Sequence, residues 1–406
     1  MKALYIHIPF CSKVCTYCDF YKMVAKSDLK EKYVDYLIKE LEMKKEYLSE
    51  IETIYVGGGT PSSLSTNSLN KLFLALKERI DLKNLKEFTV EANPNDINPD
   101  FVNLLAAYKV NRVSLGVQSL KSKKLKFLGR THRKGTVKKA IKYLKEGGIT
   151  NINADIIFGT QKDKKKIAIK DLKKLLKWEV THISTYSLQL EEKTILYKKF
   201  KENKFIPINE NLDSDIYFAI CEFLKQKGFI HYEVSNFALN DNYKSVHNLT
   251  YWNNDKYLGI GAAASYYIDN IRYTNINNLN KYFEGIDNES LCYLEEDEIV
   301  PGEKMFEEVM LGFRKLEGIN LQKFEEKFEK TIFDAYPVVN KLIDNGNLEV
   351  SNGYIKVPES KIYILNNILI NFLDEDLDKA YENKITESAE YDISESIISA
   401  EENTNE

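Results

Sequence analysis

Residues 8–20 read IPFCSKVCTYCDF and follow directly on the short apolar run Ala3–Ile8. Cys11, Cys15 and Cys18 form a C-x₃-C-x₂-C pattern, which places three thiolates in one tight loop after a strand. Three thiolates suit a soft metal or an iron–sulfur cluster. A four-iron cluster has four corners, so three cysteines leave one iron open to a small-molecule ligand.

Two other interpretations of these cysteines are open: a zinc site, or three unrelated buried thiols. Zinc motifs usually come as two C-x₂-C pairs or include histidine ligands, and the sequence contains no second pair. The remaining cysteines, Cys221 and Cys292, stand alone, and we interpret them as ordinary buried thiols. The spacing therefore favours an iron–sulfur cluster.

The composition is that of a globular protein. The chain has 406 residues, of which 43% are hydrophobic and 12% aromatic, enough for a barrel-sized domain and one smaller domain. Clustered cysteines without a disulfide framework indicate a reducing compartment. Since no leader peptide and no run of transmembrane length is evident, we predict a cytoplasmic protein without a transmembrane segment.

The net charge of −4 gives no reason to expect nucleic acid as a partner. Lysine is nevertheless concentrated in two stretches, residues 121–145 and 162–177. We interpret most of these lysines as solvated faces of helices. The alternative is contact with anionic groups or a membrane surface, which would place the protein peripherally at the inner face of the membrane.

Up to about residue 190, short apolar runs alternate with longer amphipathic stretches. In Lys30–Leu48 and Leu69–Ile80, apolar residues recur at three- and four-residue steps, as in helices. Strand–helix alternation predicts an α/β fold with a parallel sheet, here a partial (β/α)₆ barrel of the TIM type. The predicted strands are Ala3–Ile8, Thr53–Val56, Glu87–Glu91, Arg112–Gly116, Asn153–Phe158 and His182–Ser187.

Three further segments are predicted after the barrel of residues 1–190. Residues 191–300 are mixed and are interpreted as an extension of the barrel. Residues 301–373 show helical patterns followed by a hairpin, which is typical of a small α+β, winged-helix-like domain. Residues 374–406 contain 12 acidic residues against 2 lysines; this composition is too polar to bury a core and predicts a disordered tail.

Polar motifs follow the predicted strands, where the active site of a parallel α/β sheet lies. Residues 56–62 read VGGGTPS, and their glycines allow a ligand to approach the backbone closely. Glu91 ends the third strand, Gln118 follows the fourth, and Asp155 lies in the fifth. Glu91 has the alternative of a structural carboxylate, and Arg130 with Asp155 has that of a plain salt bridge.

A second dense motif reads HNLTYW over residues 247–252. A histidine beside Tyr251 and Trp252 suits an axial haem ligand with a flat aromatic wall. The alternative is a histidine packed in the core, which by itself is the commoner case.

Together these motifs resemble the radical S-adenosylmethionine (SAM) enzymes related to oxygen-independent coproporphyrinogen oxidase. The likeness extends from Tyr5 to about residue 370. Within this group the chain is similar to the radical SAM haem chaperones, whose haem-binding signature is H-N-x-x-Y-W. Asp19 and Phe20 stand where the oxidase has a further cysteine in a C-x-C pair, and the oxidase's extension before the first strand is missing.

Two positions depart from the pattern of these relatives. Residues 159–161 read GTQ in place of the usual G-L-P-G-Q, and Ser265 stands where many relatives have a histidine. The second departure removes one candidate haem ligand and leaves His247 as the main one.

The resemblance implies a role for individual residues. Cys11, Cys15 and Cys18 match the ligands of a [4Fe-4S] cluster. The positions that match contacts to the cluster-bound SAM are Tyr5, Gly58 and Glu91. The positions that match a second SAM site in the oxidase are Tyr17, Gly59, Thr60, Gln118, Arg130 and Asp155. The positions of the haem motif are His247, Tyr251 and Trp252.

The implied function is that of a haem chaperone. It would carry a [4Fe-4S] cluster, bind SAM and haem, and deliver haem to acceptor haem proteins, including membrane-bound respiratory proteins. The first alternative is an enzyme, the oxygen-independent oxidase that decarboxylates coproporphyrinogen III, because the two share one scaffold. The second is a radical SAM enzyme that degrades haem.

Overall fold

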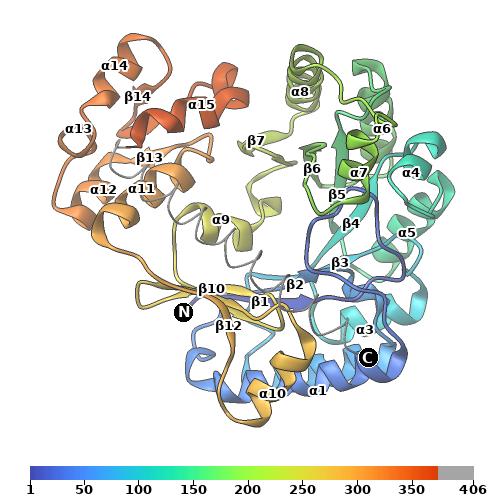
Figure 1. Cartoon of the computed structure of the whole chain (residues 1–406). Coiled ribbons are helices and arrows are strands. Elements are labelled where there is room, and N and C mark those ends of the chain that lie inside the picture. The colour runs from blue at the N-terminus through green and yellow to red at the C-terminus, as the bar shows by residue number, and fades with distance from the viewer. Residues whose placement is uncertain (374–406) are drawn as a thin grey trace, which may run out of the picture. The chain divides into compact units, whose positions relative to one another are not determined.

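The computed structural model describes residues 1–373, and the predicted tail lies outside the described residues. The chain divides into two compact units, Met1–Pro301 and the residues from Gly302 onward (Figure 1). The first unit is built on a sheet of 12 strands in the order β12-β11-β10-β9-β1-β2-β3-β4-β5-β6-β8-β7. No described helix is long and apolar enough to cross a membrane.

Six parallel strands form the middle of this sheet and confirm the predicted fold class. Their backbones pair in sequence order, for example Tyr5 with Tyr55 and Tyr55 with Thr89. Nearly every side chain in them is buried, as expected for a parallel sheet covered on both faces. The strands are β1 Ala3–Ile8, β2 Thr53–Gly58, β3 Glu87–Ala92, β4 Arg112–Gln118, β5 Asn151–Phe158 and β6 His182–Ser187.

The connecting helices are amphipathic and bury one apolar stripe each. In the fifth of them, Val137, Ile141 and Leu144 are buried while the intervening lysines are not. The helices are α1 Ser27–Met43, α2 Thr66–Arg79, α3 Pro99–Ala107, α4 Ser122–Phe127, α5 Lys134–Glu146 and α6 Lys165–Lys177.

The mixed segment after β6 extends the sheet at both of its edges. Strand β9 pairs in parallel with β1, whereas β8 pairs antiparallel with β6. The strands are β7 Ile230–Glu233, β8 Asn236–Ala238, β9 Tyr257–Ile260, β10 Ser265–Ile268, β11 Ile271–Asn275 and β12 Tyr293–Glu298. The helices are α7 Ile195–Lys201, α8 Glu210–Gln226, α9 Val246–Trp252 and α10 Leu279–Asp287.

The second unit combines short helices with an antiparallel sheet in the order β13-β15-β14. Asn352 and Gly353 connect β14 and β15 with positive φ angles of 53° and 77°, the turn that suits a two-residue hairpin. The strands are β13 Ile319–Asn320, β14 Glu349–Ser351 and β15 Tyr354–Lys356. The helices are α11 Pro301–Gly312, α12 Leu321–Phe328, α13 Ile332–Ala335, α14 Val338–Asp344 and α15 Leu365–Leu369.

One prediction about the isolated cysteines was wrong. Cys221 is buried in α8 as expected, but Cys292 is exposed just before β12. The apolar neighbourhood of a cysteine in sequence does not reveal whether the loop around it is covered.

Candidate functional site

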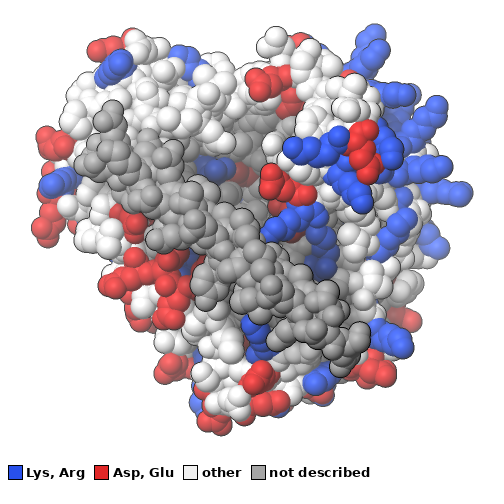
Figure 2. All heavy atoms as spheres, viewed as in Figure 1, with Lys and Arg blue, Asp and Glu red and all other residues white. Residues whose placement is uncertain are grey.

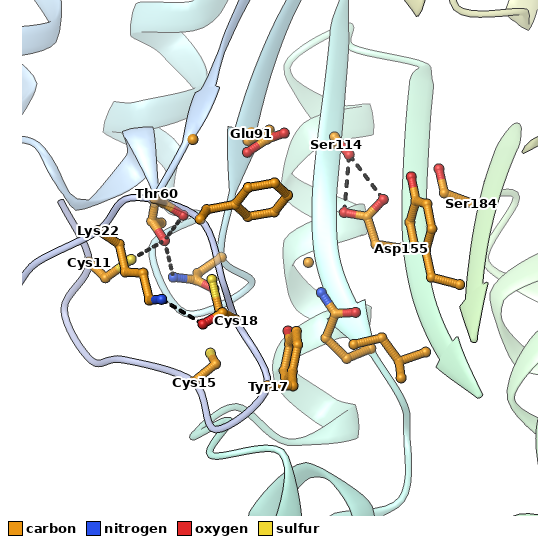
Figure 3. A pocket seen from close by; sticks show the side chains of 18 of the residues that line it. Cys11, Cys15, Tyr17, Cys18, Lys22, Thr60, Glu91, Ser114, Asp155 and Ser184 are labelled. Atoms are coloured by element: carbon orange, nitrogen blue, oxygen red, sulfur yellow. Dashed lines mark hydrogen bonds between the residues drawn. The ribbon is translucent and has the colours of Figure 1, made fainter. Parts of the chain in front are cut away.

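A cavity of about 460 Å³ lies within the first unit at the carboxyl ends of the parallel strands. This volume is in the range of small-molecule sites. Figure 3 shows Cys11, Cys15 and Cys18 on one side of the cavity, with Asp155 and Ser184 on the other. The strand ends therefore bring together the cysteine loop and the polar residues that follow later strands.

Backbone hydrogen bonds fix the cysteine loop to the rest of the first unit. The amide of Cys11 donates to the carbonyl of Met23 at 2.9 Å, and the amide of Met23 donates to Pro9 at 2.7 Å. In the middle of the loop, the Thr16 amide donates to the Leu128 carbonyl, 3.2 Å away, after the end of α4. The loop is thus held at its base and at its centre.

The thiols face a mixed electrostatic environment. Burial raises the pKa of Cys11, and it raises the pKa of Cys18 to about 11. The ammonium of Lys22 opposes the effect at Cys18, and an Arg130 nitrogen lies 3.5 Å from the Cys15 sulfur. These cations would stabilise thiolates when a metal group replaces the thiol protons.

The donor set consists of three thiols that line one cavity. Within residues 1–373, no three His, Cys, Asp or Glu side chains converge closely enough to hold one metal ion. Cys11, Cys15 and Cys18 all open into the same cavity, so their chemistry fits a [4Fe-4S] group with one free corner.

The glycine turn lies directly behind the cysteine loop. Gly58 has a φ of +107°, and a Cβ placed on it would lie 2.6 Å from the ring of His7. The Tyr5 hydroxyl is 2.9 Å from Nδ1 of His7, and Nε2 of His7 is 3.1 Å from the Tyr21 carbonyl. Burial lowers the pKa of His7 to about 4, so the neutral ring accepts from Tyr5 and donates to Tyr21.

Tyr5 is the one predicted SAM contact that is not among the residues lining the cavity. Its hydroxyl reaches His7, and His7 in turn holds the backbone after Cys18. The structure therefore connects Tyr5 to the cysteine loop through an imidazole.

Glu91 lies at the end of β3 and faces the glycine turn. The Tyr55 hydroxyl donates to its carboxylate at 2.7 Å. Burial raises the pKa of Glu91 to about 7, although the bond from Tyr55 acts in the opposite direction. In its ionised form, the Glu91 carboxylate can form an ion pair with the ammonium group of a ligand.

The residues of the second predicted SAM site all line the cavity. They are Tyr17, Gly59, Thr60, Gln118, Arg130 and Asp155. Arg130 donates to the Asn93 side chain and the Gly116 carbonyl. Asp155 accepts from Ser114 at 3.2 Å and from Asn153 at 2.7 Å. The described contacts contain no salt bridge between Arg130 and Asp155; each side chain is instead hydrogen-bonded to the neighbours just named and lines the cavity.

The H-N-x-x-Y-W motif lies at the other end of the strands. His247 in α9 is fully buried, and its Nδ1 is 2.9 Å from the hydroxyl of Thr53, the first residue of β2. Its Nε2 is 2.8 Å from the Tyr251 hydroxyl. Its backbone amide donates to Glu87, the first residue of β3, at 3.2 Å. Helix α9 thus covers the amino-terminal ends of β2 and β3. Of the six residues of the motif, Asn248 is the one that lines the cavity.

Several cavity residues were not predicted from the sequence. They alternate along the strands, as side chains on one face of a sheet do. Among the unpredicted lining residues, those with this alternation are Tyr55 in β2, Arg112 and Ser114 in β4, Asn153 in β5, and Ser184 and Tyr186 in β6. Counting back in steps of two from Gln118 and Asp155 would have found those in β4 and β5.

Comparison with known proteins agrees with the fold. A model of the radical SAM superfamily matches residues 5–175, and a model of the HemN C-terminal domain matches residues 300–360. The coproporphyrinogen III oxidase HemN of Escherichia coli, a radical SAM enzyme, has a TM-score of 0.79 at 21% identity. That match covers 91% of this chain and 90% of the oxidase, and it supports the fold.

The curated relatives are more similar in sequence. "Heme chaperone HemW" of Lactococcus lactis is 36% identical and covers 92% of this chain and 97% of its own length. The protein of the same name from Escherichia coli is 32% identical and covers 92% of this chain and 98% of its own length. Because this similarity runs through both units, the chain belongs to the HemW-type heme chaperone family of the radical SAM superfamily.

Proposed function

We propose that this protein binds haem and delivers it to acceptor haem proteins. In this proposal, a [4Fe-4S] cluster would be held by Cys11, Cys15 and Cys18. SAM would bind at the iron that has no cysteine ligand. The cluster and SAM are the cofactors of the radical SAM family. The acceptors include membrane-bound respiratory proteins, which a protein at the inner membrane face would reach from the cytoplasm.

The observation that carries this proposal is that the Phe20 side chain is exposed in the cavity. Phe20 follows Asp19 at the position where the oxidase resemblance expects a further cysteine. Its side chain lines the cavity and is 63% exposed. Tyr186 also lines the cavity and is 43% exposed. Two accessible aromatic rings in one cavity, Phe20 on the cysteine loop and Tyr186 on β6, suit the flat apolar face of a porphyrin.

SAM would bind in the same cavity. Glu91 receives its ammonium group, and the backbone of Gly58 and Gly59 approaches it closely. Tyr5 acts on this site through His7. A second SAM would contact the set described above, from Tyr17 to Asp155. A reduced cluster, when present, would supply an electron to SAM. The residues of this chain would bind SAM, orient it and cover it.

The alternative is the oxidase that decarboxylates coproporphyrinogen III. Anaerobic reconstitution of the cluster, followed by separate additions of haem and coproporphyrinogen III, distinguishes the two. We expect a stable haem complex with a Soret band and no loss of carboxyl groups from the porphyrinogen. Conversion of the porphyrinogen to decarboxylated product, without stable haem binding, would establish the enzyme instead.

His247→Ala tests the haem ligand. With His247 as axial ligand, its Nε2 would exchange the Tyr251 hydroxyl for iron, and the haem would lie at the amino-terminal end of the strands, away from Phe20 and Tyr186. The variant should then have a shifted Soret band and bind haem on the order of tenfold more weakly, because an iron–imidazole bond is lost. Tyr251→Phe is the matched control, since it removes the competing hydroxyl and should not weaken haem binding.

Circular dichroism must first show that both variants fold. A parent-like Soret band and affinity in His247→Ala would reject His247 as ligand and leave it as the anchor of α9. His132 would then be the next histidine to test.

SAM affinity should depend on pH through Glu91. This acid is protonated below its raised pKa of about 7 and ionised above it, and the ammonium of SAM binds the ionised form. Between pH 7 and pH 5.5 the affinity should therefore fall by roughly fifteenfold, because the ionised fraction of Glu91 falls from about one half to about 3%. Equilibrium dialysis measures this. Glu91→Gln should bind weakly at every pH, and an equally steep profile in that variant would contradict the assignment.

A further inference from the structure

Positive charge is concentrated in one part of the first unit. Residues 121–178 contain 19 Lys and Arg against 4 Asp and Glu, whereas the whole chain has a net charge of −4. The segment covers α4, α5, β5 and α6. An excess of this size, in a protein that is otherwise acidic, is a local feature of the surface rather than a property of the composition.

Folding turns these lysines outward together. Helix α5 buries Val137 and Ile141, and α6 buries Leu172 and Leu175. Figure 2 shows Lys and Arg gathered over the region that Figure 1 labels α4, α5 and α6. We call this surface the basic face. Its exposed lysines are Lys123, Lys126, Lys134, Lys138, Lys139, Lys142, Lys162, Lys164, Lys165, Lys166, Lys170, Lys173 and Lys177.

Few carboxylates neutralise the basic face. Among its exposed lysines, Lys142 pairs with Glu146 at 3.4 Å and Lys165 with Asp215 at 3.2 Å. Within residues 1–373, no carboxylate lies at ion-pair distance from the others. Lys174 lies among them, and its pKa is lowered by desolvation and next by the charge of Lys134 on the neighbouring helix. The lysines of α5 and α6 therefore repel one another and favour an external anion.

The rest of this surface indicates what kind of anion it meets. Between residues 121 and 178, all of which the structure describes, no large hydrophobic side chain is highly exposed. A protein partner usually needs such apolar anchors, and single-stranded nucleic acid needs aromatic rings for base stacking. A broad array of lysines without either feature suits a continuous anionic surface.

We propose that the basic face docks the protein on an anionic lipid bilayer. The attraction is electrostatic, with each lysine near the headgroups increasing partition roughly fivefold. It should weaken steeply with added salt, since the Debye length falls to about 8 Å at physiological ionic strength. None of the exposed lysines of the basic face lines the cavity, so docking is independent of the cluster, SAM and haem.

Cosedimentation with vesicles tests the proposal on the full chain. The parent protein should bind phosphatidylglycerol–phosphatidylcholine vesicles at low salt and not pure phosphatidylcholine. The test variant changes four lysines without ion pairs to glutamine: Lys134, Lys138, Lys170 and Lys177. It should bind roughly six-hundredfold more weakly, about fivefold for each of the four lysines, with unchanged iron content after reconstitution.

The matched control changes four exposed lysines of other segments to glutamine: Lys26, Lys77, Lys83 and Lys281. It loses the same net charge and should retain most of the binding. An equal loss in both variants would overturn the proposal, because only net charge would then matter. So would binding of duplex DNA by the parent protein without binding of the anionic vesicles.

Discussion

Cys15→Ala is expected to abolish the iron–sulfur cluster. After anaerobic reconstitution, iron and sulfide should fall from about four of each per chain to near zero. The physical reason is the donor set: with one iron already open, loss of a second thiolate leaves only Cys11 and Cys18 to hold the cube. The brown colour and its shift on SAM addition should vanish together.

The fold should survive this change. Cys15 is half-buried, and its described hydrogen bond is the 3.5 Å contact from Arg130. The free energy of unfolding should therefore change by less than about 1 kcal/mol. Cys221→Ala is the matched control, since it removes a buried thiol far from the loop in sequence and should retain the full cluster. A full complement of iron and sulfide in Cys15→Ala would show that the ligand assignment is wrong.

Gly58→Val is expected to lose SAM binding while keeping the cluster. Valine is strained at a φ of +107°, and its Cβ would meet the His7 ring at 2.6 Å. Strain and overpacking together should cost roughly 3–5 kcal/mol of unfolding free energy. The displaced His7 would release Tyr21, whereas the backbone bonds of Cys11 and Thr16 would still hold the cysteines.

Equilibrium dialysis with SAM and denaturant unfolding measure the two effects. The matched control is Gly135→Val, because a Cβ on Gly135 meets nothing within 4 Å. Its stability should stay within about 1 kcal/mol of the parent protein, with SAM affinity unchanged. Parent-like SAM affinity in Gly58→Val would move the SAM site away from this turn.

The sequence determined the parallel core because its signals are local. Six apolar runs separated by amphipathic stretches predicted β1–β6, and the C-x₃-C-x₂-C spacing placed three thiols in one loop without any tertiary information. The glycine turn and the acid at the end of β3 could be located for the same reason. In a parallel sheet, strand ends share one edge, so residues far apart in sequence were correctly expected to lie around one cavity.

Only the tertiary structure decided which side chains touch. The sequence pattern left residues 191–300 as a mixed segment, because pairing β9 with β1 and β8 with β6 joins strands that are distant along the chain. It also could not show that His7 fills the space behind Gly58. Nor could it show that His247 bonds Thr53 and Tyr251 at the end of the strands opposite the cysteines. The spacing of residues in the sequence determines which reactive side chains a loop carries. Their burial and their hydrogen-bond partners depend on contacts between distant segments, which form only when the chain folds.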